Sequence, residues 1–170
     1  MAPEELVLGV DVGGTKVAVA ALRGPEVVAR AERPTVLSSS SALLDGLEAT
    51  AREVIAESGP PVAVGVGVPS QIDYGTGTVE TSVNIPLTGV ALREELGHRF
   101  GIPVFVDNDA NVAALAEARL LGCDELLMLT LGTGVGGGVV TGGRIFRGAH
   151  GLGAELGHFT LMPDGPPCPG

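Results

Sequence analysis

The chain has 170 residues, of which 45% are apolar, and its formal net charge is −10. This composition predicts a folded protein with a hydrophobic core and excludes a disordered chain. The acidic balance argues against a broad nucleic-acid surface, because phosphate backbones are bound by clustered Lys and Arg. A nucleotide ligand stays open, since backbone N–H groups and one metal ion can hold it.

The sequence predicts a cytoplasmic protein without a membrane partner. No run of about 18 apolar residues occurs, so we expect no membrane span. The first residues, MAPEELVLGVDV, lack the basic and the long apolar regions of a signal peptide. Cys123 and Cys168 do not form a disulfide framework, which fits a reducing compartment.

Apolar runs and turn residues predict an α/β order in the N-terminal part. We expect strands at Leu6–Val12, 16–22 and 26–33, a helix that is capped within 38–41 and stopped at Gly59, and a strand at 62–68. Residues 74–78 are rich in turn formers. The remaining elements are a helix at Leu92–Phe100, a strand at 103–107, a helix at 110–121, and strands at 125–131 and 138–141. This order indicates an α/β domain followed by the opening of a second one.

The segment Asp11-Val12-Gly13-Gly14-Thr15-Lys16 joins the first two expected strands. Its glycines let backbone amides point into the turn, and Thr15 adds a hydroxyl, which makes a nest for anionic oxygens. Asp11 could hold a hydrated Mg²⁺. An ordinary hairpin turn is an equally good interpretation. A Walker A loop is excluded, because Thr15 precedes Lys16 and a strand follows.

A second glycine-rich segment, 131–138, contains G-x-G-x-x-G at Gly132, Gly134 and Gly137 directly after an expected strand. The residues that follow are typical of a strand, whereas the Rossmann fingerprint requires a helix, so we reject NAD. Two Gly-Thr turns between strands suit the binding of a polyphosphate chain from two sides.

Polar residues gather in Asp107-Asn108-Asp109-Ala110-Asn111, between a strand and a helix. A cluster of N-caps is the plain structural interpretation, because Asn and Asp are preferred there. One or two caps would suffice, however. A carboxylate at a strand end also suits a general base that takes the proton of a sugar hydroxyl attacking phosphorus.

The glycine-dense segment 148–158 carries Glu155 and His158, three residues apart. They could clamp vicinal hydroxyls or form a solvated face, and the solvated face is the simpler interpretation of the residues alone. Cys168 follows ten residues later. One His and one Cys are a weak indication of zinc, since structural zinc takes four ligands.

In order and spacing, these motifs and the segment 65–69 resemble the ROK family, which groups repressors, open-reading-frame products and sugar kinases. The resemblance covers nearly the whole chain. It implies an α/β fold of the actin-like ATPase (ribonuclease H-like) type. Residues 1–109 would form its N-terminal domain, and residues 110–170 the truncated beginning of a second domain.

The resemblance also implies residue roles. The first phosphate motif would comprise Asp11, Gly13, Gly14, Thr15 and Lys16, and the second Thr133, Gly134 and Gly136. Asp109 is similar to the catalytic base of the family. The residues that resemble its sugar contacts are Asn108, Asp109, Glu155 and His158. His158 and Cys168 would be ligands of a structural zinc.

Two positions depart from the family pattern. Ser70 and Gln71 follow Pro69, where the family usually has a glycine, which changes how the backbone approaches the sugar. Gly170 stands where the zinc motif has its second cysteine. The zinc is therefore expected in the full-length parent rather than in this chain.

The resemblance implies an ATP- and Mg²⁺-dependent hexose kinase, with glucose converted to glucose 6-phosphate as the expected reaction. A small sugar and ATP would be its partners, with no nucleic acid and no membrane. The choice of hexose, polyphosphate as a donor, and a homo-oligomer stay open. One alternative is a sugar-sensing regulator, which would carry a DNA-binding helix-turn-helix before the first phosphate motif. Another is an inactive fragment of the kinase.

Overall fold

The computed structural model describes residues 5–132, 134–149, 151–160 and 162–165. It divides the chain into two compact units, Met1–Asp109 and Ala110–Gly170. Among the described residues, no helix is long and apolar enough to cross a membrane.

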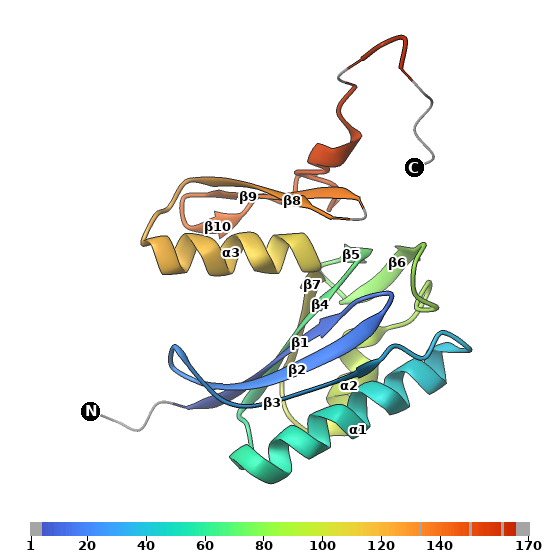
Figure 1. The fold of residues 1–170 in the computed structure, drawn as a ribbon, viewed down its shortest axis with the longest axis vertical. Coiled ribbons are helices and arrows are strands. Elements are labelled where there is room, and N and C mark those ends of the chain that lie inside the picture. The colour runs from blue at the N-terminus through green and yellow to red at the C-terminus, as the bar shows by residue number, and fades with distance from the viewer. Residues whose placement is uncertain (1–4, 133, 150, 161, 166–170) are drawn as a thin grey trace. The chain divides into compact units, whose positions relative to one another are not determined.

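A five-stranded sheet in the order β3-β2-β1-β4-β7 forms the centre of the first unit (Figure 1). Three of its strands make an antiparallel meander, namely β1 (Leu6–Val12), β2 (Lys16–Arg23) and β3 (Glu26–Pro34). On the other side of β1 the sheet continues in parallel with β4 (Ala63–Val68) and β7 (Val104–Asn108). All five strands are confirmed as predicted, within a few residues at their ends.

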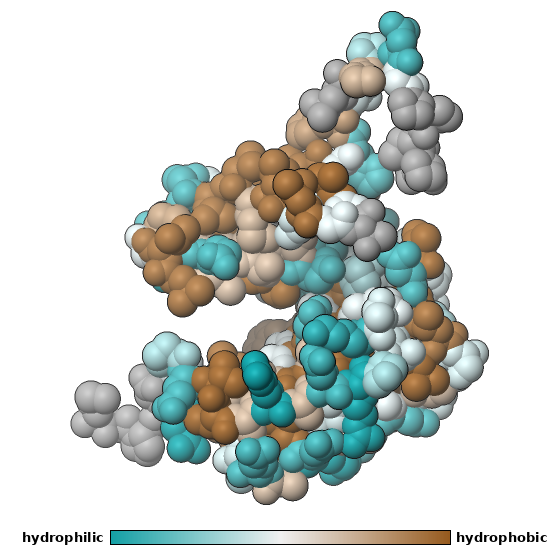
Figure 2. All heavy atoms as spheres, in the orientation of Figure 1, coloured by the Kyte–Doolittle hydropathy of each residue, from teal (hydrophilic) through white to brown (hydrophobic). Residues whose placement is uncertain are grey.

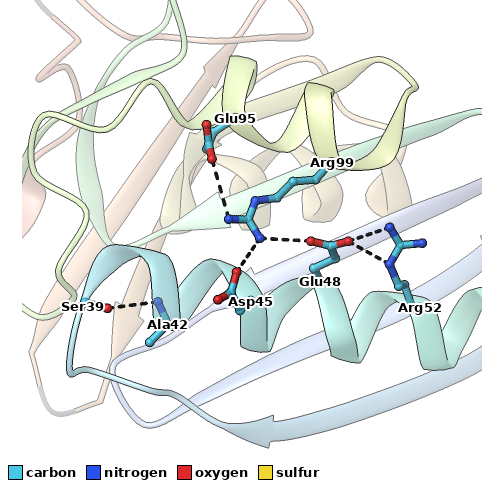
Figure 3. Close-up of polar contacts among 7 residues, drawn as sticks. All are labelled: Ser39, Ala42, Asp45, Glu48, Arg52, Glu95 and Arg99. Atoms are coloured by element: carbon cyan, nitrogen blue, oxygen red, sulfur yellow. Dashed lines mark hydrogen bonds and ion pairs between the residues drawn. The ribbon is translucent and has the colours of Figure 1, made fainter.

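Two helices share the core with one face of this sheet. In β1, the alternate residues Leu6, Leu8, Val10 and Val12 are buried, and they belong to one apolar cluster with residues of both helices. α1 (Ser40–Ser58) begins at Ser39, whose Oγ accepts a hydrogen bond from the Ala42 N–H at 3.1 Å (Figure 3). α2 (Leu92–Phe100) ends at Gly101, whose φ of 68° is the left-handed conformation that favours glycine.

One hairpin, which consists of β5 (Ser70–Asp73) and β6 (Thr78–Ser82), was not predicted from the sequence. Only its turn was predicted. Both strands are short and mostly polar, so no clear alternation of apolar residues marks them. The hairpin is held from α2, where Arg93 donates from Nη2 to the Tyr74 carbonyl at 2.6 Å and from Nη1 to the Gly75 carbonyl at 2.8 Å.

The second unit packs a helix against a three-stranded sheet. Its elements are α3 (Asp109–Leu121, whose first residue belongs to the first unit), β8 (Leu126–Leu131), β9 (Val135–Thr141), β10 (Arg144–Ile145) and the short 3-10 helix η1 (Leu156–His158). Figure 2 shows apolar surface (brown) over β8 and β9. On β8, Leu127, Leu129 and Leu131 are exposed.

The predicted start of β9 was wrong. The sequence analysis assigned 132–137 to a turn, whereas residues 135–137 pair with 129–131 of β8. Glycines were interpreted as turn residues, but here they allow close packing. A Cβ added to Gly138 would lie 2.5 Å from the Ala114 Cβ on α3, and one added to Gly136 would lie 2.7 Å from the Thr130 Oγ1.

Candidate functional site

The carboxyl ends of β1, β4 and β7 bring polar side chains together at one edge of the first unit's sheet. Asp11 pairs in register with Gly67, and Gly67 pairs with Asp107. Residues that pair across strands share a face, so both carboxylates lie on one face with a residue without a side chain between them. Asn108 and Asp109 follow directly, where β7 ends and α3 begins.

Asp11 and Asp109 interact electrostatically. Burial is the largest cause that raises the pKa of Asp11, the negative charge of Asp109 raises it further, and the Lys16 ammonium lowers it. Asp11 is exposed by its solvent-accessible surface, so the burial that raises its pKa is only partial, and Asp109 is half-buried. Two neighbouring carboxylates repel each other, and a divalent cation relieves that repulsion. Carboxylate oxygens are also the ligands that Mg²⁺ prefers, so the residues fit a magnesium ion.

The turn between β1 and β2 is tightly fixed. The Gly13 N–H donates to the Lys16 carbonyl at 2.8 Å, and a Cβ on Gly13 would lie 3.2 Å from that oxygen. Thr35, directly after β3, holds the turn, because its Oγ1 donates to the Gly13 carbonyl at 2.6 Å and its N–H donates to the Thr15 carbonyl at 2.9 Å.

This bracing leaves a smaller anion nest than the motif predicted, because the Gly13 N–H is already used. Within the described part of the chain, the N–H groups of Gly14 and Thr15 have no hydrogen-bond partner. Both residues are exposed. They are therefore the donors that the turn offers to phosphate oxygens.

Lys16 is engaged with a residue that the sequence analysis did not consider. Its Nζ donates to the Glu32 Oε2 on β3 at 2.7 Å, and both side chains are exposed. This hydrogen bond is the main cause that raises the pKa of Lys16. The predicted phosphate ligand is thus an ammonium already paired with a carboxylate.

Asn108 is held by two neighbours. Its N–H donates to the Asp107 Oδ1 at 2.8 Å, and its Nδ2 donates to the Ser70 carbonyl in a long hydrogen bond of 3.5 Å. Asp107 and Ser70 are both buried. Neither residue was predicted to have a role of its own, although both lie beside the predicted motifs in the sequence.

In the second unit, η1 packs against β9. A Cβ added to Gly137 would lie 2.6 Å from the Leu156 Cδ1, and one added to Gly157 would collide with the Val135 carbonyl. Because these glycines let η1 lie close to β9, Glu155 and His158 are held near the strand that follows the glycine-rich turn. The His158 Nε2 lies 3.8 Å from the Glu155 Oε2, and each side chain is about half exposed (53% and 51%).

The remaining predicted residues are placed as follows. A Cβ on Gly134 would meet nothing within 4 Å, so this turn is open, while Gly136 lies inside β9. Thr133 and Cys168 lie outside the described residues. Among the residues that are described, no three His, Cys, Asp or Glu side chains group to hold a metal. Structure thus brings together Asp11, Asp109 and Asn108 in the first unit, and Glu155 with His158 in the second.

A family model described as the ROK family matches residues 7–169. The chain belongs to the ROK family. Its mixed α/β fold around a central sheet is the actin-like ATPase fold of ROK sugar kinases, of which this chain contains a part.

Individual relatives agree with this assignment. A glucokinase of Halalkalibacterium halodurans is 38% identical over 95% of this chain and 52% of its own length. A ROK hexokinase structure from Thermus thermophilus matches with a TM-score of 0.86 at 40% identity, over 96% of this chain and 56% of that one. A ROK glucokinase from Streptomyces griseus in complex with glucose and AMPPNP matches with a TM-score of 0.85 at 35% identity, over 94% and 52%. The chain spans about half the length of the relatives it matches.

Proposed function

We propose that this chain forms the acceptor-activating part of a cytoplasmic, ATP-dependent hexose kinase that converts glucose to glucose 6-phosphate. The observation that carries the proposal is the Asp11–Asp109 pair at the sheet edge, whose mutual repulsion contributes to the raised pKa of Asp11. Carboxylates gathered at the carboxyl ends of strands, with a pKa shifted by their neighbours, are common at functional sites. The complex of the Streptomyces griseus relative with glucose and AMPPNP supports the substrate class.

In the proposed reaction, Asp109 accepts the proton of the sugar 6-hydroxyl as that oxygen bonds to the γ-phosphorus. The bond from this phosphorus to the bridging oxygen breaks, and ADP leaves with the bond's electron pair. Asn108 orients the sugar, and the N–H groups of Gly14 and Thr15 bind phosphate oxygens. A bound Mg²⁺, held through Asp11, would supply neutralisation of phosphate charge.

Glu155 and His158 would contact sugar hydroxyls, and the turn with Thr133, Gly134 and Gly136 would hold further phosphate oxygens. The described residues supply only His158 of the two expected zinc ligands, so no step is derived through zinc. Polyphosphate as an alternative donor and a homo-oligomer belong to the same proposal.

The test is Asp109→Asn in the full-length protein that contains this chain. We expect sugar binding to persist and turnover to fall by a factor of roughly 10² to 10⁴, because general-base catalysis typically contributes that much. Turnover is measured as ADP release with Mg²⁺–ATP and a panel of hexoses, and binding by calorimetry. Asp164→Asn, at an exposed position, is the matched control and should keep full activity. Near-normal turnover of Asp109→Asn would overturn the role of Asp109.

A further inference from the structure

Ser70 is one of the few polar side chains buried in the first unit, with 7% of its surface exposed. It is the first residue of β5, and it pairs in register with Ser82, the last residue of β6. The Ser70 Oγ donates to the Ser82 Oγ at 2.8 Å. A buried hydroxyl needs such a partner, because an unsatisfied one would cost free energy.

Ser82 is itself fixed by Thr88. The Ser82 N–H donates to the Thr88 Oγ1 at 3.0 Å, and the same hydroxyl donates to the Ser82 carbonyl at 3.2 Å. The Ser82 backbone is therefore held by hydrogen bonds at both its N–H and its carbonyl. The Ser70 hydroxyl thus bonds to a residue whose own backbone is held in place.

The backbone of Ser70 in turn contacts Asn108. The Ser70 carbonyl accepts the hydrogen bond from the Asn108 Nδ2 at 3.5 Å. A carboxamide has a donor end and an acceptor end, so a carbonyl on Nδ2 determines which end is turned toward other partners. The Ser70 carbonyl thus holds the Nδ2 end of the Asn108 carboxamide.

The segment that holds Ser82 also lies against the phosphate turn. A Cβ added to Gly14 would lie 3.6 Å from the Asn84 Cβ and 3.6 Å from the Asn84 carbonyl. One stretch of backbone, residues 82–88, thus contacts the first phosphate turn and anchors the hydroxyl pair beside Asn108. A shift of this stretch would move both.

We propose that the Ser70–Ser82 hydroxyl pair positions Asn108 and thereby sets the affinity for the acceptor sugar. The choice of a sugar as the ligand rests on the proposed function, whereas the contacts among Ser70, Ser82 and Asn108 do not. The Ser70 hydroxyl ties the first residue of β5 to the last residue of β6.

The kinetic test uses Ser70→Ala, Ser82→Ala and the double variant in the full-length protein. Each single change should raise KM for the hexose about three- to tenfold, the effect of one neutral hydrogen bond. The kcat and the KM for ATP should stay near the wild-type values. The double variant should be no worse than either single one, because both remove the same contact. Ser82→Thr, which keeps the hydroxyl, should restore KM, and Ser58→Ala, which removes a hydroxyl bonded to the Val54 carbonyl on α1, should leave KM unchanged.

A second readout does not depend on turnover. In ¹H–¹⁵N spectra of this chain, the Asn108 side-chain amide, assigned with Asn108→Asp, should shift in Ser70→Ala and Ser82→Ala and stay in place in Ser58→Ala. An active enzyme with unchanged KM in both serine variants would overturn the positioning role, as would an unmoved Asn108 amide. If the wild-type protein phosphorylates no hexose but the amide shifts, the proposed function fails while the positioning of Asn108 stands.

Discussion

Individual glycines serve different purposes in this chain. Gly77 has a φ of 76°, and the side chain of Arg93 occupies the space where its Cβ would be, so both backbone and packing require glycine. Gly138 has no positive φ, and it is needed only because α3 lies so close to β9. Gly97, on α2, has neither reason, since a Cβ there would meet nothing within 4 Å.

The same substitution should therefore have opposite effects at two positions. Gly138→Ala should lower the free energy of unfolding by about 1–3 kcal/mol, the usual cost of overpacking, because its Cβ would press on Ala114 and on the Ala110 carbonyl. Gly97→Ala should raise it by about 0.5–1 kcal/mol through better helix propensity. Urea unfolding followed by circular dichroism measures both. Equal effects of the two changes would contradict the packing of α3 on β9.

At the scale of elements, an ion cluster joins α1 to α2 (Figure 3). The Arg99 Nη1 lies 2.7 Å from the Asp45 Oδ1 and 3.0 Å from the Glu48 Oε2, and its Nη2 lies 3.7 Å from the Glu95 Oε1. Arg52 binds the other oxygen of Glu48 at 2.6 Å. The Arg99 and Glu48 side chains are only 20% and 21% exposed, so solvent screens this pair less than the pairs whose two partners are both exposed.

Arg99→Met should lower the free energy of unfolding by about 1 kcal/mol at pH 7, since it leaves several carboxylates without their cation. The hydrogen bond from Arg52 is the main cause that lowers the pKa of Glu48, burial opposes it, and Arg99 lowers the pKa further. A carboxylate with a lowered pKa stabilises the fold above its ordinary value of 4.5, and this contribution is lost as the pH falls through the folded-state pKa. The difference between variant and wild type should therefore shrink below pH 4.5.

The matched control for this prediction is Arg33→Met. Arg33 pairs with Glu53 at 2.7 Å, but both side chains are more than half exposed. Its loss should cost less than about 0.5 kcal/mol at any pH, as is usual for surface ion pairs. If thermal unfolding from pH 3 to 8 shows the same small, constant effect for both arginines, the cluster is no more than surface charge.

The elements themselves were mostly predictable. Apolar residues recur with the spacing of a strand in β1 and with that of a helix in α1, and the structure confirms both elements. The hairpin of β5 and β6 was missed, because it is held by tertiary contacts, the burial of Ile72 and Val79 in the core and the hydrogen bonds of Arg93, rather than marked by a local pattern. The early start of β9 was missed for a related reason: a run of glycines predicts a turn unless a helix packs against it.

At the scale of the whole molecule, the chain holds about half the length of its relatives. In the second unit, Leu127, Leu129 and Leu131 stay exposed by 52–80% of their surface. The proposed reaction needs an adenosine pocket, which the site residues assigned above do not provide.

We therefore predict that the full-length protein phosphorylates one hexose of the panel and that this 170-residue chain alone turns over none at a measurable rate. The comparison uses the same ADP-release assay, and circular dichroism confirms that the chain is folded. Turnover by the chain alone would show that the first half suffices. If the full-length protein phosphorylates no sugar, a sensor or binding role replaces the kinase.

By itself, the sequence determined the family and the five strands of the first sheet, and it predicted the residues of the candidate site, because short motifs and apolar periods are local properties of a chain. Only the tertiary structure decided which of these residues meet. It placed Asp109 beside Asp11, paired Lys16 with Glu32, and set Ser70 and Ser82 behind Asn108. These contacts join residues distant in the sequence, and their geometry follows from strand register and helix packing, which no local pattern encodes.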